Sequence, residues 1–409
     1  MTQITPLLRR TPAYVGDQPF AGDVIGNRID IARQLTEHLA RLTEGAVIGI
    51  DAPWGEGKTW FGRNWQAQLD AAGYSTVYLD AFENDGIDDP FLLIAAEILN
   101  LEIVGNKSQR ASFVQKAAAV GRRIIPAVAK GAIKGATKAI GLTEVSQEVS
   151  EAIQDAGSAV GDAAEKYLET RINELEKTRK SAAAFKSRLE DIAKKSPNPI
   201  VFFVDELDRC SPAFAVKLIE RIKHFFDVPN LVFVLLLNRR QISAALKGVY
   251  GSETDTATYM NKFVHFFLTL PKRWGAEVGH AGDPANFCME VVRRFGLTSV
   301  SGAVNFSDGV SQMAKPLEMS LRDIERAFIL FGLAGRIDNS AGLAGYLACL
   351  KIKQPELFAG VLNGQSKSHS ECATLIERGF PGVHEDLPKM WWLMHKAVLG
   401  NSVPIPDQE

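Results

Sequence analysis

The chain has 409 residues, which is too many for one compact core and predicts two or three domains. Its 46% hydrophobic and 23% charged residues are ordinary for a soluble globular protein. Lys plus Arg (46) nearly balance Asp plus Glu (48), so the net charge of -2 excludes a globally basic nucleic-acid binder but not a local basic patch. The four cysteines form no CxxC pair, and the N-terminus has no apolar core. We therefore expect a cytoplasmic location and no signal peptide.

Helices and strands alternate in the first part of the chain. Residues 1–22 carry Pro6, Pro12 and Pro19 with little periodicity, and are predicted to form an extended N-terminal arm. The elements predicted after it are a helix at 27–42, a strand at 46–50, a helix at 58–72, a strand at 75–80 and a helix at 90–99. Short apolar runs between helical segments are typical of buried parallel strands. Residues 23–104 are therefore predicted to begin an α/β core.

The composition changes over residues 105–195. From Ala111 to Thr143 the chain is rich in Ala and Gly, with six basic residues and no acidic one. From Glu144 to Asp191 the pattern is helical and mixed in charge, and Pro197 and Pro199 follow. We predict that 105–195 is an inserted helical element.

The core resumes after this insert. The elements predicted next are a strand at 200–204, a helix at 214–226 and a strand at 231–237, followed by helices at 286–295, 321–333, 341–352 and 388–399. The predicted fold class is α/β, with a parallel-sheet core formed by 23–104 and 196–271. Residues 272–409 are predicted to form an all-helical, lid-like C-terminal domain.

A phosphate-binding loop is predicted between the strand at 46–50 and the helix at 58–72. Small residues let backbone N–H groups turn towards a phosphate, a lysine meets the β- and γ-phosphate charge, and the next hydroxyl binds magnesium. The predicted nucleotide-binding residues are Pro53, Trp54, Gly55, Glu56, Gly57, Lys58, Thr59 and Trp60. Ala52 stands where the usual pattern has glycine, which costs little if its φ is negative. The strand–loop–helix setting predicts a P-loop NTPase core.

The acidic partner of this loop is predicted at the end of the strand at 200–204. Asp205 would hold Mg²⁺ through water, and the hydroxyl of Thr59 would be a second ligand. Glu206 would polarise the water that attacks the γ-phosphate. The apolar run before these two residues disfavours the alternative of an acidic strand end that merely faces solvent.

Other polar residues follow the same strands. Asn238 ends the strand at 231–237 and could reach the γ-phosphate or its water, or be an ordinary turn residue. Arg239 or Arg240 could serve a neighbouring subunit as an arginine finger, although an exposed surface arginine is the simpler reading. Arg209 could be a salt-bridge partner, a charge sensor or a trans-acting finger, and the sequence does not rank these roles.

Taken together, the motifs resemble the KAP family of P-loop NTPases, within the STAND and AAA+ group. Residues 53–59 are similar to that family's phosphate loop, which has a tryptophan before the first of these glycines. Residues 203–210 are similar to its acidic strand end followed by Leu-Asp-Arg, although the family usually has aspartate where this chain has Glu206. Residues 321–324 resemble its helical-domain arginine motif, which implies that Arg322 is a sensor-2-like residue near the γ-phosphate.

Two weaker blocks extend the resemblance over residues 20–335, interrupted by the insert. They are the strand at 231–237, after which aspartate is common where this chain has Asn238, and the apolar segment 262–271. The resemblance implies ATP with Mg²⁺ as cofactors. It favours adenine over guanine, since the guanine-reading NKxD motif is absent. It also implies ATP hydrolysis used as a switch or for assembly.

The biological expectations rest on the same resemblance. Many bacterial members are linked to defence against phage or plasmids, and others to membrane scaffolding. We expect a homo-oligomer, partner proteins of a defence system, or both. The predicted catalytic residues are Lys58, Glu206, Asn238 and Arg322. The rival readings are a nucleotide-binding scaffold with little hydrolysis and a nucleic-acid-stimulated motor.

Several members of the family carry transmembrane helices where this chain has its insert. Between Lys116 and Lys138 the longest uncharged stretch is 124–129, which is too short to span a membrane. Residues 113–142 could instead form a basic helix on an anionic surface at the inner membrane, pack in an oligomer, or contact a phosphate backbone. A solvated helical hairpin packed on its own core is the simpler alternative.

Overall fold

The computed structural model describes residues 18–42, 44–87, 89–124, 180–225, 228–271, 284–334 and 341–379. The chain divides into two compact units, each considered by itself below. The first takes its described residues from within 1–35, 51–67 and 269–409, and the second from within 36–50 and 68–268. Most of the predicted arm and insert, and the helix predicted at 388–399, lie outside the described residues.

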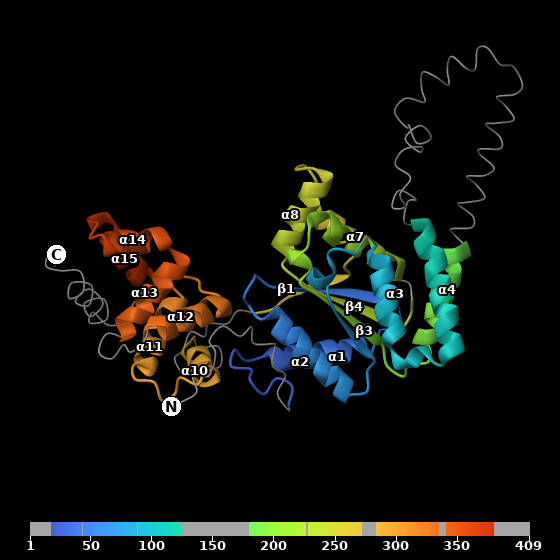
Figure 1. The fold of residues 1–409 in the computed structure, drawn as a ribbon, viewed down its shortest axis with the longest axis horizontal. Helices are drawn as coiled ribbons and strands as arrows, with labels where there is room; N and C mark the ends of the chain where they lie inside the picture. The colour runs from blue at the N-terminus through green and yellow to red at the C-terminus, as the bar shows by residue number, and fades with distance from the viewer. Residues whose placement is uncertain are drawn as a thin grey trace, which may run out of the picture. The chain divides into compact units, whose positions relative to one another are not determined.

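A five-stranded sheet is the centre of the second unit (Figure 1). Its order is β2-β3-β4-β1-β5. The strands are β1 (Ala46–Asp51), β2 (Thr76–Asp80), β3 (Ile200–Asp205), β4 (Leu231–Leu237) and β5 (Phe266–Thr269). β2 pairs with β3 and β3 with β4 in parallel. The α/β class with a parallel sheet is therefore confirmed.

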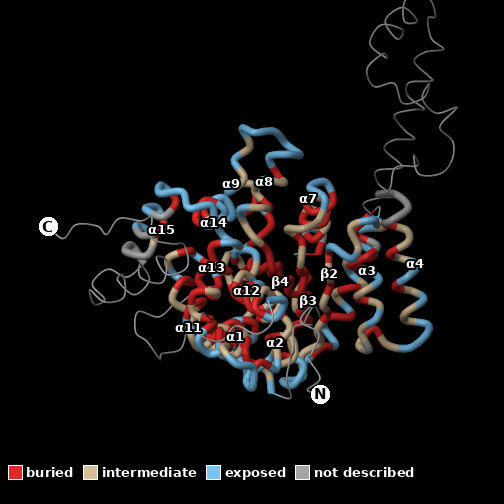
Figure 2. The backbone as a smooth tube through the Cα atoms, turned by 60° about the vertical axis from the view of Figure 1, so that its left-hand side comes forward, coloured by how far each residue is buried: buried red, intermediate tan, exposed pale blue. Residues whose placement is uncertain are grey.

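Burial explains why the central strands read as unbroken apolar runs. Every residue of β3 and β4 is buried, as the red tube of Figure 2 shows. Side chains alternate between the two faces of a strand, so a strand covered on both faces needs apolar residues throughout. β5 was not predicted as a strand. Its four residues are only partly buried or exposed, and backbone hydrogen bonds from His265 to Val47 and from Leu270 to Asp51 align it with β1.

Helices of the second unit cover the sheet. They are α3 (Pro90–Asn100), α4 (Lys107–Ile124), α7 (Pro212–Ile222), α8 (Arg239–Tyr250) and the short α9 (Thr256–Met260), together with a helix at 180–193. α7 and α8 lie together over one face of the sheet in Figure 1. The rings of Phe91, Phe113 and Phe185 meet at 5.0–5.3 Å, so α3, α4 and the helix at 180–193 share one apolar core.

The first unit contains the helical part of the chain beyond the sheet. Its helices are α10 (Pro284–Arg294), α11 (Ala303–Ala314), α12 (Leu321–Ala334), α13 (Ala341–Lys353), α14 (Pro355–Leu362) and α15 (Ser366–Gly379). They pack around buried aromatic rings, with Phe306 at 5.3 Å from Phe328 and 4.6 Å from Phe331. Among the described residues from 284 onward there are helices and no strand, as predicted.

The phosphate-loop region belongs to the same unit. The start of α1 (Arg28–Leu39) and most of α2 (Lys58–Ala71) lie within it. Residues 18–22, predicted as extended arm, form a turn in which Phe20 packs on Trp60 and Phe61. The backbone N–H of Phe20 donates to Oδ1 of the buried Asn64 on α2, at 2.8 Å. The segment before α1 is thereby held against α2.

Candidate functional site

The predicted phosphate loop connects β1 to α2. Gly55 and Gly57 have φ values of +85° and +79°, in the region that side chains disfavour. Ala52 is fully buried and is not among the residues with positive φ, so alanine is accommodated there without backbone strain. The loop therefore has glycine at the two positions whose conformation requires it.

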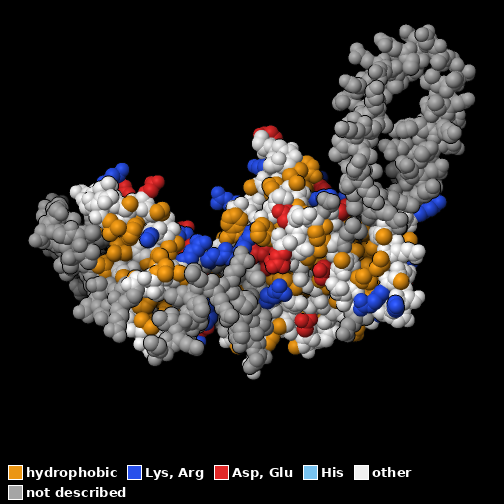
Figure 3. Space-filling model, in the orientation of Figure 1, with side chains coloured by type: hydrophobic (Ala, Val, Ile, Leu, Met, Phe, Trp, Pro, Cys, Tyr) orange, Lys and Arg blue, Asp and Glu red, His pale blue; other side chains and the backbone are white. Residues whose placement is uncertain are grey.

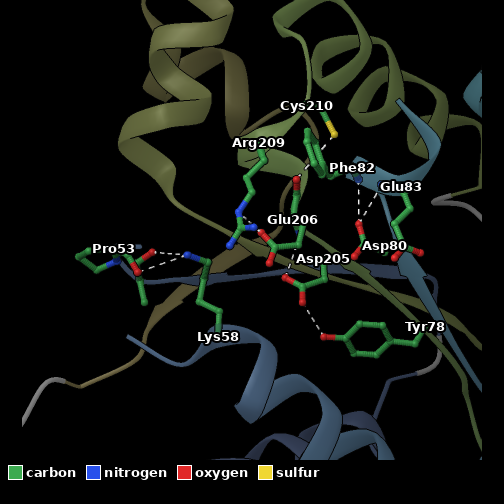
Figure 4. Close-up of polar contacts among 11 residues, drawn as sticks. Pro53, Lys58, Tyr78, Asp80, Phe82, Glu83, Asp205, Glu206, Arg209 and Cys210 are labelled. Carbon is green, nitrogen blue, oxygen red and sulfur yellow. Dashed lines mark hydrogen bonds and ion pairs between the residues drawn. The ribbon is translucent and has the colours of Figure 1, made fainter. Parts of the chain in front are cut away.

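Lys58, the first residue of α2, points back into the loop. Its Nζ donates to the carbonyl oxygens of Ala52, at 2.8 Å, and Pro53, at 3.3 Å (Figure 4). The side chain is only 8% exposed. Thr59 is the next residue of the helix, where a hydroxyl would face the same ligand. Trp54 is 46% exposed, so the aromatic ring typical of this loop is open to solvent.

The start of α12 packs against Gly55. The backbone N–H of Arg322 donates to the carbonyl oxygen of Gly55 at 3.2 Å. A Cβ at Gly55 would lie 2.7 Å from Oγ of Ser320 and 2.9 Å from Cβ of Arg322. Ser320 and Asp323 cap the helix reciprocally, each side chain accepting from the other's backbone N–H. The arginine predicted as a nucleotide sensor is thus next to the phosphate loop within one unit.

Asp205 ends β3 and is held at both carboxylate oxygens. Oδ1 accepts from the backbone N–H of Glu206 and Oδ2 from the hydroxyl of Tyr78 on β2, both at 2.8 Å. The Tyr78 ring stacks on Phe203, its register partner, with centroids 5.6 Å apart. Asp205 is 2% exposed. A buried carboxylate of fixed orientation is suited to holding a hydrated cation.

Glu206 occupies a strained backbone position. Its φ of +57° and ψ of +21° are left-handed, which is uncommon for a residue with a side chain and is seen at functional sites. Its carboxylate forms an ion pair with Nε of Arg209 at 2.5 Å (Figure 4). Burial is the largest of the causes that together raise the pKa of Glu206 to about 7; the carboxylates of Asp205, Asp208 and Asp80 also raise the pKa, and Arg209 lowers it.

Three residues near these motifs are not predicted from the sequence: Arg28, Tyr78 and Asp80. Asp80 is the register partner of Asp205, and its Oδ1 accepts from the backbone N–H groups of Phe82 and Glu83. Its position at the end of a predicted parallel strand is a signal that could have drawn attention to it. Arg28 carries no such signal, because it reads only as the first turn of an amphipathic helix.

The side chains of Asn238 and Arg239 have structural partners. Oδ1 of Asn238 caps α8 by accepting from the backbone N–H groups of Arg240 and Gln241, at 3.1 and 3.4 Å. A contact with nucleotide or water would therefore involve its Nδ2. The guanidinium of Arg239 lies 4.6 Å from the centroid of the Phe267 ring.

The oxygen donors predicted to bind a metal ion are of the kind that suits magnesium, which takes few of its ligands from the protein itself. Magnesium is usually held by one or two carboxylates together with substrate phosphates and water. Asp205 and the Thr59 hydroxyl are oxygen donors of this kind. Within the part of the chain that the structure describes, no group of three or more His, Cys, Asp or Glu side chains is arranged to hold a metal ion.

The described part of the basic segment 113–142 ends at residue 124 and belongs to α4. Phe113, Ala117 and Val120 face the core of the second unit. Lys and Arg side chains lie over the lower end of α4 in Figure 3. Nη1 of Arg110, on α4, donates to the carbonyl oxygen of Leu99 at 2.8 Å. None of the described helices is both long and apolar enough to cross a membrane.

Comparisons with known proteins found a family model that matches most of the chain. The KAP family P-loop domain matches residues 28–327. The chain is similar to the Aeropyrum pernix ORC2 protein in its ADPNP-ADP complexes, at 13% identity and a TM-score of 0.39, over 96% of this chain and 84% of that one. For the ADP form of ORC2 the identity is 10% and the TM-score 0.37, over 94% and 87%. No curated protein matches the sequence.

Proposed function

The chain belongs to the KAP family of P-loop NTPases, and from this premise we propose that it hydrolyses ATP and uses the reaction as a switch or to control assembly. The observation that carries the proposal is the state of Glu206. Its left-handed backbone and a pKa raised to about 7 are the properties of a residue held for general-base chemistry rather than for stability.

The proposed reaction is in-line attack of water on the γ-phosphate. Glu206 positions and polarises the water, while Lys58 and the loop N–H groups stabilise the phosphate charge. Asp205 and Thr59 would hold Mg²⁺, which when bound neutralises charge on the β- and γ-phosphates. Arg322, beside Gly55, would respond to the γ-phosphate. The strand order of the sheet supports these roles. β1 leads into the phosphate loop and β3 into Asp205 and Glu206, and only β4 lies between the two strands.

A second candidate is a nucleotide-binding scaffold with little turnover. The ion pair between Glu206 and Arg209 favours it, because a carboxylate engaged by a guanidinium is a weaker base for water. In that case nucleotide binding, rather than hydrolysis, would control the protein.

The biological role is proposed from the family resemblance. We propose a bacterial anti-phage or anti-plasmid defence role for a homo-oligomer, with or without partner proteins. A peripheral membrane contact would fall on the part of 113–142 beyond α4, since the described apolar face of α4 packs on its own core. A nucleic-acid-stimulated motor is the remaining alternative, and it requires that DNA or RNA raise the hydrolysis rate.

Phosphate release by wild type and Glu206→Gln tests the proposal. We expect the wild type to release phosphate and the variant to lose activity by about a hundredfold or more while still binding ATP. A wild type that binds ATP without turnover would establish the scaffold reading instead. Particle size measured with and without ATP then tests nucleotide-controlled assembly, and unchanged rates with DNA and RNA would exclude the motor.

A further inference from the structure

Arg28 is a buried charge in contact with the phosphate loop. It is the first residue of α1 and is 2% exposed. Its Nη2 donates to the carbonyl oxygen of Glu56 at 2.6 Å, and its Nη1 to that of Gly57 at 3.3 Å. Its Nε is buried without a hydrogen-bond partner. The guanidinium therefore has only two backbone carbonyls, both in the loop, as its hydrogen-bond acceptors among the described residues.

Burial of the charged Arg28 guanidinium has a desolvation cost that lowers the stability of the fold. Burial lowers the pKa of Arg28, and the carboxylates of Asp23 and Glu56 partly offset that effect. Asp23 also fixes the backbone before α1, because its carboxylate accepts from the N–H groups of Gly26, at 3.1 Å, and Arg28, at 2.9 Å. A buried charge with an incomplete set of partners is destabilising. Its placement against the loop therefore calls for a role other than stability.

Peptide geometry supplies that role. In a trans peptide the C=O of one residue and the N–H of the next point in opposite directions. The described peptide bonds include no cis bond. With the carbonyls of Glu56 and Gly57 facing Arg28, the N–H groups of Gly57 and Lys58 face away from it. These are N–H groups of the kind that a P-loop turns towards a phosphate.

The Arg28 guanidinium is closely surrounded by residues of the loop and of α2. A Cβ at Gly57 would lie 2.6 Å from Nη1 of Arg28, so glycine is needed there for clearance as well as for its positive φ. The Trp60 ring lies with its centroid 5.8 Å from Cζ of Arg28, and Phe20 packs on that ring edge-on. Arg28 is thus held in one place by the loop, by α2 and by the segment before α1.

We propose that Arg28 is a positioning residue of the phosphate loop, which orients the N–H groups of Gly57 and Lys58 towards the phosphates of a bound nucleotide. The inference rests on nucleotide binding but not on hydrolysis. Because backbone N–H groups of such a loop hold the α- and β-phosphates, the effect extends to ADP as well as ATP.

The test is ADP binding to the full chain, measured by calorimetry without Mg²⁺. Arg28→Ala is expected to weaken binding by about tenfold or more, since hydrogen bonds to charged groups are the strong ones. Arg28→Lys should bind ADP with intermediate affinity, because lysine keeps the positive charge but cannot donate to two carbonyl oxygens with the planar geometry of a guanidinium. Arg33→Ala is the matched control, since Arg33 lies on the same helix but is exposed and pairs only with Asp30 in the described structure.

Chemical rescue separates positioning from a merely structural role. Low millimolar guanidinium is expected to restore ADP binding to Arg28→Ala, while ammonium is not. The proposal would be overturned by an Arg28→Ala variant that has the melting temperature of the wild type and also binds ADP with wild-type affinity. If Arg28→Ala does not fold, wild-type affinity in Arg28→Lys would overturn it. A wild type that binds ADP without releasing phosphate would refute the proposed hydrolysis alone, so the two failures are distinguishable.

Discussion

The hydroxyl of Tyr78 donates to Oδ2 of Asp205 at 2.8 Å, although the two residues are 127 positions apart in the chain. Parallel pairing of β2 with β3 brings them together, since Tyr78 is in register with Phe203 and Asp80 with Asp205. The opposite oxygen of Asp205 accepts from the backbone of Glu206. Asp205 is the proposed magnesium ligand, and both of its carboxylate oxygens are thus held by hydrogen bonds from the protein itself.

Tyr78→Phe is expected to weaken metal binding while leaving metal-free ADP binding unchanged. The substitution removes one hydroxyl and keeps the ring that stacks on Phe203. Loss of an outer partner of a metal ligand costs about tenfold in metal affinity. The measurements are Mn²⁺ binding by electron paramagnetic resonance and the Mg²⁺ concentration at half-maximal phosphate release.

Tyr250→Phe is the control for this variant. It removes a tyrosine hydroxyl that hydrogen-bonds to Glu220. Equal Mn²⁺ affinities in Tyr78→Phe and Tyr250→Phe would show that the Tyr78 hydroxyl does not position Asp205 for metal.

The Glu206 carboxyl is expected to titrate near pH 7 in the protein free of metal and nucleotide. Burial and the neighbouring carboxylates together raise its pKa from an ordinary value of 4.5 to about 7, against the lowering effect of Arg209. Arg209→Ala should therefore move the titration to higher pH, whereas bound Mg²⁺ should move it to lower pH. The carboxylate infrared band, taken as the difference between wild type and Glu206→Gln, follows this titration.

The same shift has a stability consequence of definite sign. A folded-state pKa above the ordinary value means that the folded state binds the proton more tightly than the unfolded state. Glu206 therefore opposes folding above pH 7, and this opposition is relieved as the pH falls from about 7 towards 4.5. A Glu206→Gln variant whose stability follows pH as the wild type does over this range would contradict the shift.

Gly55→Ala is expected to disrupt the loop more than Gly73→Ala, although both glycines have positive φ, at +85° and +80°. Backbone strain in each case lowers the free energy of unfolding by about 1–2 kcal/mol. At Gly55 the new Cβ also meets Ser320 and Arg322, whereas nothing lies within 4 Å of a Cβ at Gly73. Urea unfolding and ADP calorimetry compare them. Equal loss of stability in the two variants, with unchanged ADP binding, would contradict the close packing of α12 on Gly55.

Local patterns determined the strands and the phosphate loop. The predicted strand at 231–237 coincides with β4, and the helix predicted from residue 58 begins there as α2. A buried strand must be apolar on both faces, and a phosphate loop must have small residues before a lysine and a hydroxyl. Both requirements act over a few adjacent residues, so they can be recognised without the tertiary structure. β5 could not be recognised in this way, because its four residues form a strand only by lying beside β1.

The tertiary structure decided which groups hold the motif residues in place. Arg28 reaches the carbonyl of Glu56 from 28 positions away, and Tyr78 reaches Asp205 from 127. Many residue types at positions 28 and 78 would fit the amphipathic pattern of α1 and the alternation of side chains in β2. Neither pattern therefore specifies a partner for these residues. Only the packing of α1 on the loop and the register of β2 with β3 select the guanidinium and the hydroxyl.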